Sequence, residues 1–203
     1  MRQQRNKNLR LGFVPTMGAL HDGHLSLVDI AQKASDGVIV SIFVNPTQFD
    51  NAKDLQNYPN TLNLDLQQLR KAGVMAVFGP AAAEIYAMDS ETIVETTQLA
   101  NRLLGAVRPW HFCGVTTVVC KLFNIVQPDL AVFGEKDYQQ LHVIRRMVRD
   151  LHIPVEIIGA PTFRESDGLA MSSQNRRLNP ADRAAARVLC RALDRAEDLV
   201  TKH

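Results

Sequence analysis

Short apolar runs alternate with amphipathic segments along most of the 203-residue chain. The apolar runs are rich in β-branched and aromatic residues and bounded by Gly, Pro or Asn, so they predict buried strands. They are LGFV (11–14), GVIVSIFV (37–44), VMAVFG (74–79), LAVFG (130–134) and VEIIGAP (155–161). Between them, apolar residues recur at spacings of three and four, which predicts helices. These helical segments are 24–35, 61–73, 114–126 and 136–151.

This alternation of strand and helix predicts an α/β fold, a doubly wound parallel sheet with helices on both faces. The tail, residues 179–203, predicts one further helix. Its apolar stripe comprises Ala185, Val188, Leu189, Ala192, Leu193, Ala196 and Leu199. A chain of this length predicts one main domain with little room for a second.

Composition and charge argue against several classes of protein. With 46% hydrophobic and 22% charged residues, the chain is typical of a globular protein with one core. Its net charge of +2 favours neither nucleic acid nor an anionic membrane as a partner, although a local basic site for a small anion stays open. Cys113, Cys120 and Cys190 are odd in number and form no CxxC pair, which argues against disulfides and structural zinc. We therefore expect a cytoplasmic protein. Its basic N-terminus has too few apolar residues after it for a signal peptide or membrane span.

Four strand ends are followed by polar, glycine-rich segments. They read PTMGALHDGH (15–24), NPTQF (45–49), GEKDYQQ (134–140) and TFRESDGLAMSSQNRR (162–177). Because ligands bind at the carboxyl ends of strands in such sheets, we expect these segments to meet at one crevice.

His21 and His24 stand where the first helix is expected to begin. Free N–H groups and the positive end of the dipole attract anions there, so two imidazoles would add donors to a phosphate site. Gly18 and Gly23 would let the backbone approach a bulky ligand. In the alternative interpretation, one histidine caps the helix and the other packs against the core. Zinc is disfavoured, because no third ligand stands at a suitable helical spacing.

PTMGALHDGH resembles the HxGH signature of the nucleotidylyltransferase superfamily, and its longer form resembles the pantothenate synthetase (pantoate–β-alanine ligase) family. SIFVNPTQF, YPNTLNLD, HFCGVTTVVCKLFNIVQPDLAVFGEKDYQQL and DGLAMSSQNRRL are similar to that family in the same order. The resemblance runs from about Leu9 to Leu178.

The resemblance implies a Rossmann-like domain over residues 1–178 and a two-step reaction. ATP and pantoate would give pantoyl adenylate and pyrophosphate, and β-alanine would then displace AMP. It also implies Mg²⁺ and a homodimer. Residues 179–203 would lead toward a smaller C-terminal lid domain that is largely absent from this chain.

The same resemblance implies roles for individual site residues. His21, His24 and Lys136 would be catalytic, with His24 at the position of a proton donor, while Gln48 and Gln140 would bind pantoate or β-alanine. Asp65 matches an acidic position associated with magnesium, although Leu64 stands where relatives often carry a second acid. The ATP-binding residues would be Met17, Gly18, Ala19, Leu20, His21, Asp22, Gly23, His24, Gly134, Glu135, Lys136, Asp137, Phe163, Met171, Ser172, Ser173 and Gln174.

The chain departs from the family pattern at two further positions. Gln174 replaces an arginine expected on the ATP phosphates, which predicts weaker phosphate binding unless Arg176 or Arg177 substitutes. Trp110 stands where a glycine is usual. Two alternatives to a working ligase stay open, a truncated module that binds ATP and pantoate with little turnover, and another adenylyltransferase of the superfamily.

Overall fold

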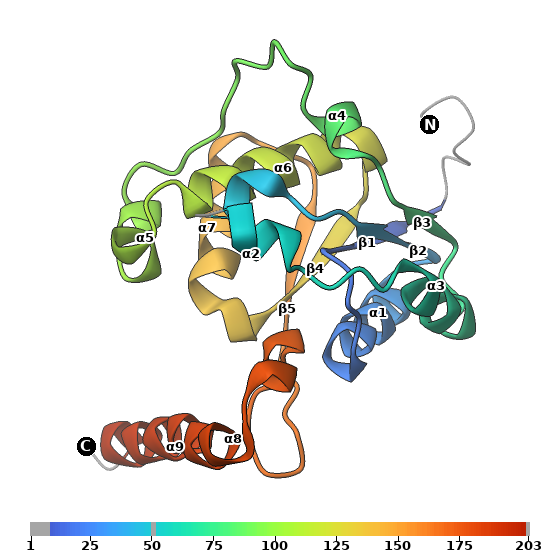
Figure 1. Cartoon of the computed structure of the whole chain (residues 1–203). Coiled ribbons are helices and arrows are strands. Elements are labelled where there is room, and N and C mark those ends of the chain that lie inside the picture. Colours follow the sequence, from blue (N-terminus) through green and yellow to red (C-terminus); the bar gives the residue numbers. More distant parts are fainter. Residues whose placement is uncertain (1–8, 50–51, 202–203) are drawn as a thin grey trace.

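Five parallel strands form one sheet in the order β3-β2-β1-β4-β5 in the computed structural model, which describes residues 9–49 and 52–201. The strands are β1 (Leu11–Thr16), β2 (Gly37–Ile42), β3 (Ala76–Phe78), β4 (Leu130–Gly134) and β5 (Glu156–Ala160). From the central β1 the chain winds outward to β3, then returns to the other side of β1 for β4 and β5 (Figure 1). The predicted doubly wound sheet is therefore confirmed. The basic N-terminal residues 1–8 lie outside the described part.

The sheet separates two apolar clusters, because successive side chains of a strand point to opposite faces. Phe13 of β1 packs with α6 (His111–Val126) and α7 (Tyr138–Asp150). Its neighbour Val14 packs on the other face with α1 (Asp22–Ala34) and α3 (Leu62–Lys71). Helices on both faces explain why the strands read as continuous apolar runs instead of alternating ones.

The predicted helices form with shifted boundaries. α6 begins three residues before the predicted Gly114, and it ends where Gln127 adopts a left-handed backbone with φ +54°. α7 begins after a short 3-10 helix over Glu135–Asp137. Short elements without a full amphipathic period were not predicted. These are α2 (Ala52–Gln56), α4 (Ala82–Ile85), α5 (Leu104–Val107) and the 3-10 helices Pro46–Gln48, Leu99–Asn101 and Ser173–Arg177.

The tail forms two helices, so the prediction of a single helix is wrong. α8 (Pro180–Ala186) and α9 (Val188–Thr201) are separated at Arg187, whose amide donates to the nearby Ala185 carbonyl. Arg183 of α8 forms ion pairs with Glu165 and Asp167, at 2.7 Å each, which hold α8 against the preceding turn. Both helices extend away from the sheet (Figure 1).

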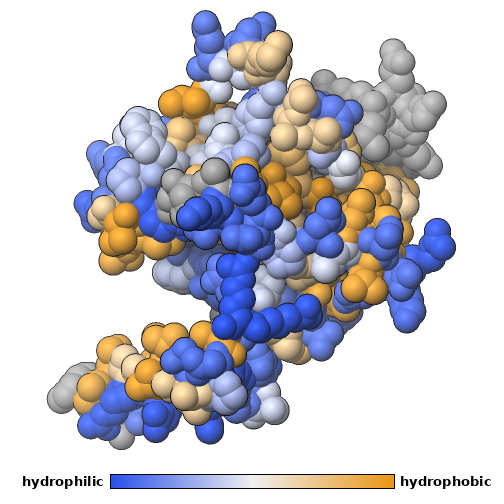
Figure 2. Space-filling model, in the orientation of Figure 1, coloured by the Kyte–Doolittle hydropathy of each residue, from blue (hydrophilic) through white to orange (hydrophobic). Residues whose placement is uncertain are grey.

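The apolar stripe of the tail is largely exposed in this arrangement. Val188, Leu189 and Leu193 of α9 are each more than half exposed, and apolar surface is visible on the projecting helices in Figure 2. Among the described residues, no helix is both long and apolar enough to cross a lipid bilayer.

A close backbone approach joins α6 to the loop after β2. The Asn45 side chain donates to the Gly114 carbonyl at 3.1 Å, and a Cβ on Gly114 would lie 2.7 Å from the Thr47 carbonyl oxygen. Only glycine therefore fits at position 114 without moving the loop that carries Asn45 and Gln48.

We predict that Gly114→Ala lowers the free energy of unfolding by about 1–3 kcal/mol, because the added methyl group overpacks this contact. Urea denaturation measures the effect. Gly79→Ala is the matched control, since a Cβ there would meet its nearest atom at 3.8 Å. Equal stability of the two variants would contradict the assigned contact.

Candidate active site

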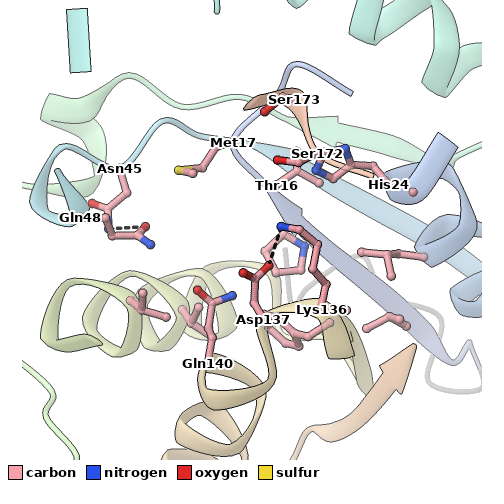
Figure 3. A pocket seen from close by; sticks show the side chains of 18 of the residues that line it. Thr16, Met17, His24, Asn45, Gln48, Lys136, Asp137, Gln140, Ser172 and Ser173 are labelled. Carbon is pink, nitrogen blue, oxygen red and sulfur yellow. Dashed lines mark hydrogen bonds and ion pairs between the residues drawn. The ribbon is translucent and has the colours of Figure 1, made fainter. Parts of the chain in front are cut away.

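A cavity of about 480 Å³ lies at the carboxyl ends of the strands. Its walls come from the residues after β1, β2, β4 and β5 and from one side of α6, so the four polar segments do meet at one crevice. Asn45 and Gln48 lie at one end and His24 and Ser172 at the other, with Gln140 and Lys136 along one side (Figure 3).

His21 and His24 stand at the start of α1 with their rings stacked at a slant. The ring centroids are 4.0 Å apart, and the planes make an angle of 37°. The His21 backbone N–H donates to His24 Nδ1 at 3.3 Å, while the His24 N–H donates to the His21 carbonyl at 2.8 Å. His24 Nδ1 is thus an acceptor, which assigns the ring proton of the neutral form to Nε2.

Burial, together with smaller effects of the neighbouring His21 and Lys136, lowers the pKa of His24 to about 3. Burial also lowers the pKa of His21, with added effects of the positive charges of Lys136 and Arg176. Both imidazoles are therefore neutral near pH 7. A neutral His24 donates a hydrogen bond through Nε2–H, and it does not act there as an imidazolium acid.

The opposite end of the cavity is held by a buried amide. Asn45 is 1% exposed, and its side-chain nitrogen donates to Gln48 Oε1 at 2.8 Å. The Gln48 carbonyl in turn accepts from an Arg108 guanidinium nitrogen at 3.0 Å and lies 3.3 Å from His111 Nδ1. Gln48 is thus fixed from both its side chain and its backbone, as a recognition residue needs to be.

Lys136 and Asp137 occupy the short 3-10 helix between β4 and α7. Lys136 Nζ lies 3.7 Å from an Asp137 carboxylate oxygen, and both side chains are well exposed at 39% and 61%. An ion pair this long and exposed is weak, so the Lys136 ammonium is able to turn toward an anionic ligand. Gln140 follows one turn later on α7 and faces the same cavity (Figure 3).

The segment after β5 forms the remaining wall. The Ser172 hydroxyl accepts from the Gln174 N–H at 3.3 Å, and the Asn175 side chain donates to Glu165 at 2.6 Å. Arg177 donates to the Asn57 carbonyl at 3.2 Å, whereas the charge of Arg176 acts on His21. Of the two arginines considered as substitutes at Gln174, Arg176 is thus the one near the histidines.

Most residues predicted for the site line the cavity. They are Met17, His21, Gly23, His24, Gln48, Gly134, Lys136, Asp137, Gln140, Phe163, Met171, Ser172, Ser173 and Gln174. Gly18, Ala19, Leu20, Asp22, Glu135 and Asp65 are not among its lining residues. Gly18, Ala19 and Leu20 are buried, while Asp22 and Glu135 are exposed.

Several lining residues were not predicted, among them Thr16, Asn45, Tyr58, Arg108 and His111. Asn45 directly precedes Pro46 in the quoted NPTQF segment, so its place after a strand was a usable signal. Arg108 precedes α6 and His111 is its first residue, in a stretch around Trp110 whose fold cannot be inferred from periodicity. Burial raises the pKa of Tyr58, against the opposing effect of its hydrogen bond with Ser173.

Asp65, predicted at a position associated with magnesium, is engaged with the backbone and does not line the cavity. It is 1% exposed, and both carboxylate oxygens already accept hydrogen bonds from the backbone of Ala19 and Leu20. Within the described ranges, no group of three or more His, Cys, Asp or Glu side chains is arranged to hold a metal ion. Of the described residues that line the cavity, Asp137 is the only one with a carboxylate side chain.

A doubly wound parallel sheet with paired histidines at a helix start, next to a lysine at another strand end, defines a nucleotide-binding α/β protein. Comparison with known proteins is consistent with this class. The family model described as pantoate-beta-alanine ligase matches residues 1–203. The chain therefore belongs to the pantoate-beta-alanine ligase family.

Individual members of this family are similar to the chain in sequence and in structure. The chain is 54% identical over 199 residues to a pantothenate synthetase of Heliobacterium modesticaldum, covering 98% of this chain and 71% of that protein. A crystal structure of the Thermus thermophilus pantothenate synthetase superposes with a TM-score of 0.94 at 50% identity, covering 99% of this chain and 73% of that one. The Francisella tularensis pantoate-beta-alanine ligase, described as complexed with beta-gamma ATP and beta-alanine, superposes with a TM-score of 0.89 at 45% identity. That match covers 95% of this chain and 74% of the Francisella chain.

The lowered pKa of His24 predicts a pH dependence of stability. Its folded-state pKa lies near 3 and its ordinary value is 6.5, so the unfolded chain binds more protons between these values. The free energy of unfolding therefore rises as pH increases through this window. The contribution of His24 is fully present above it. We predict that His24→Asn loses less stability than the wild type between about pH 7 and about pH 5. Urea denaturation at both pH values measures this, and equal losses would refute the assignment.

Proposed function

We propose that this chain joins pantoate to β-alanine at the expense of ATP, releasing AMP and pyrophosphate. The observation that carries the proposal is the single cavity that brings together the paired histidines, Lys136 and the glutamines Gln48 and Gln140. Family membership supplies the substrates, and the cavity supplies one end rich in phosphate-binding groups and another rich in amides.

In the first step, a carboxylate oxygen of pantoate attacks the α-phosphorus of ATP and pyrophosphate leaves. Negative charge that develops on the phosphates would be stabilised by the Nε2–H of His24, by the Lys136 ammonium and by the Ser172 hydroxyl. In comparable sites, a donor aimed at such charge contributes about 100-fold to 1,000-fold in rate. Because His24 stays neutral, we assign it electrostatic stabilisation of the leaving group instead of proton donation.

In the second step, the β-alanine amine attacks the acyl carbon of pantoyl adenylate, the C–O bond to AMP breaks, and an amide forms. The attacking amine gives up its proton to solvent as AMP departs. The amide end of the cavity would orient the acyl group through Gln48, whose side chain Asn45 holds. Holding both reactants in one cavity supplies most of what such a step needs, since it replaces a bimolecular encounter.

Magnesium enters the proposal as the ion that accompanies ATP. Mg²⁺ keeps several waters and is commonly held by substrate phosphates with one or two carboxylates, so the cavity needs no dedicated protein cage. When bound, the ion would neutralise phosphate charge, and Asp137, which lines the cavity, would be the carboxylate available to it. Asp65 is not, because of its buried hydrogen bonds.

A homodimer and a cytoplasmic location complete the proposal. The dimer is supported by the family resemblance alone. The cytoplasm is supported by three free cysteines, Cys113, Cys120 and Cys190, which fit a reducing compartment.

Pyrophosphate release from ATP tests the function directly. We predict that the chain releases pyrophosphate when given ATP, Mg²⁺ and pantoate, and forms AMP and pantothenate when β-alanine is added. His24→Ala should lose at least about 100-fold of the first-step rate while remaining folded, because one phosphate donor is removed. Pyrophosphate release that is independent of pantoate would point to another adenylyltransferase, and ATP binding without release would point to a binding module.

Gln48→Ala separates the two ends of the cavity. We predict that this variant raises the KM for pantoate about tenfold while the KM for ATP changes less than about twofold, because a single recognition hydrogen bond is lost at the amide end. Steady-state kinetics with each substrate varied in turn provide the measurement. Equal increases in both KM values would assign Gln48 to general scaffolding.

A further inference from the structure

A buried carboxylate lies directly beneath the loop that connects β1 to α1. Asp65, in the first turn of α3, accepts the Ala19 N–H on Oδ2 at 3.0 Å and the Leu20 N–H on Oδ1 at 2.9 Å. The Thr61 hydroxyl donates to Oδ2 at 3.1 Å. Asp65 is 1% exposed, so these contacts are shielded from water.

The loop above this carboxylate has a conformation that needs support. Gly18 and Ala19 both have left-handed backbones, with φ of +80° and +51°. This conformation is unfavourable for alanine by about 1–2 kcal/mol. It turns two successive amides toward α3, where Asp65 accepts both. A Cβ on Gly18 would lie 3.1 Å from Asp65 Oδ2, so the loop and the carboxylate fit closely.

The energetics favour a carboxylate at this position. A buried charge is costly unless hydrogen bonds satisfy it, and here three donors do so. The position in the first turn of α3 adds the favourable end of the helix dipole. Each carboxylate oxygen receives its own backbone amide, which a neutral amide side chain cannot reproduce, because one of its two atoms is itself a donor.

The loop ends at the paired histidines. Leu20 immediately precedes His21, whose backbone N–H donates to the His24 ring at 3.3 Å. The position of the backbone at residues 19 and 20 therefore sets the position of both rings. Met17, on the other side of the left-handed pair, lines the same cavity.

We propose that Asp65 is a positioning residue, which shapes the nucleotide-binding loop through the amides of Ala19 and Leu20 and does not ligate magnesium. The proposal rests on the proposed function, since it assumes that the cavity binds ATP. It replaces the role that the sequence resemblance implied for this acid.

Calorimetry of ATP binding to Asp65→Asn, with Mg²⁺ and separately with EDTA, distinguishes the two roles. A positioning residue shapes the phosphate and adenine contacts themselves, so we expect ATP to bind at least about tenfold more weakly under both conditions. A metal ligand would weaken binding only when Mg²⁺ is present. That result, or unchanged binding under both conditions, would overturn the proposal.

Asp29→Asn is the matched control. Asp29 carries the same carboxylate on the exposed face of α1, 60% exposed and paired with Lys33, so its replacement should leave ATP binding unchanged. Thr61→Val removes one donor to Asp65 and keeps both backbone contacts, so it should weaken ATP binding by less than Asp65→Asn under both conditions. A loss in Thr61→Val as large as that in Asp65→Asn would count against the two amides as the means of positioning.

If Asp65→Asn fails to fold, the wild-type chain still decides the question. The Ala19 and Leu20 amide protons should exchange slowly with solvent although they precede α1, and their NMR shifts should not respond to Mg²⁺ alone. Fast exchange, or a saturable shift with Mg²⁺, would overturn the proposal. These measurements need no nucleotide, so a wild type that binds no ATP would refute the proposed function while the role of Asp65 is tested separately.

Discussion

The common direction of the five strands determines where the cavity forms. All five strands are parallel, so their carboxyl ends lie at one edge, and the order β3-β2-β1-β4-β5 makes the chain reverse direction beside β1. The loop after β1 and the loop after β4 therefore leave the sheet in opposite directions, which opens a space between them. The histidines stand at the helix start that follows the first loop, and Lys136 follows β4, so neither segment builds the cavity alone.

Within that space, burial decides what each polar group can do. His24 is shielded enough to stay neutral, which leaves its ring able to donate a hydrogen bond through Nε2–H. Lys136 lies near the surface, so its side chain keeps its freedom to move. Asp65 and Asn45 are each 1% exposed and act on the protein itself, by holding the loops that present the histidines and Gln48. How deeply each polar side chain is buried thus determines whether it is available to a ligand or holds the protein's own loops.

The sequence was sufficient to predict the strands, the faces of the sheet and the crevice, because these depend on local periodicity and on the general properties of parallel sheets. It was insufficient where the outcome depends on contacts between distant segments. Asp65 meets Ala19 and Leu20 across 46 and 45 positions, and no local pattern distinguishes a buried acceptor from a metal ligand. The break at Arg187 depends on a single amide that turns to the Ala185 carbonyl, within a segment whose apolar spacing is uniformly helical.

If this one cavity activates the carboxylate of pantoate as an acyl adenylate, the two oxygen atoms of that carboxylate must end in two different products. Pantoate labelled with ¹⁸O in both carboxylate oxygens is incubated with the chain, ATP, Mg²⁺ and β-alanine, and the products are analysed by mass spectrometry. Attack of the carboxylate on the α-phosphorus predicts one labelled oxygen in AMP and the other in the amide carbonyl of pantothenate. Pantothenate formed with unlabelled AMP and with label in pyrophosphate or phosphate would contradict the account.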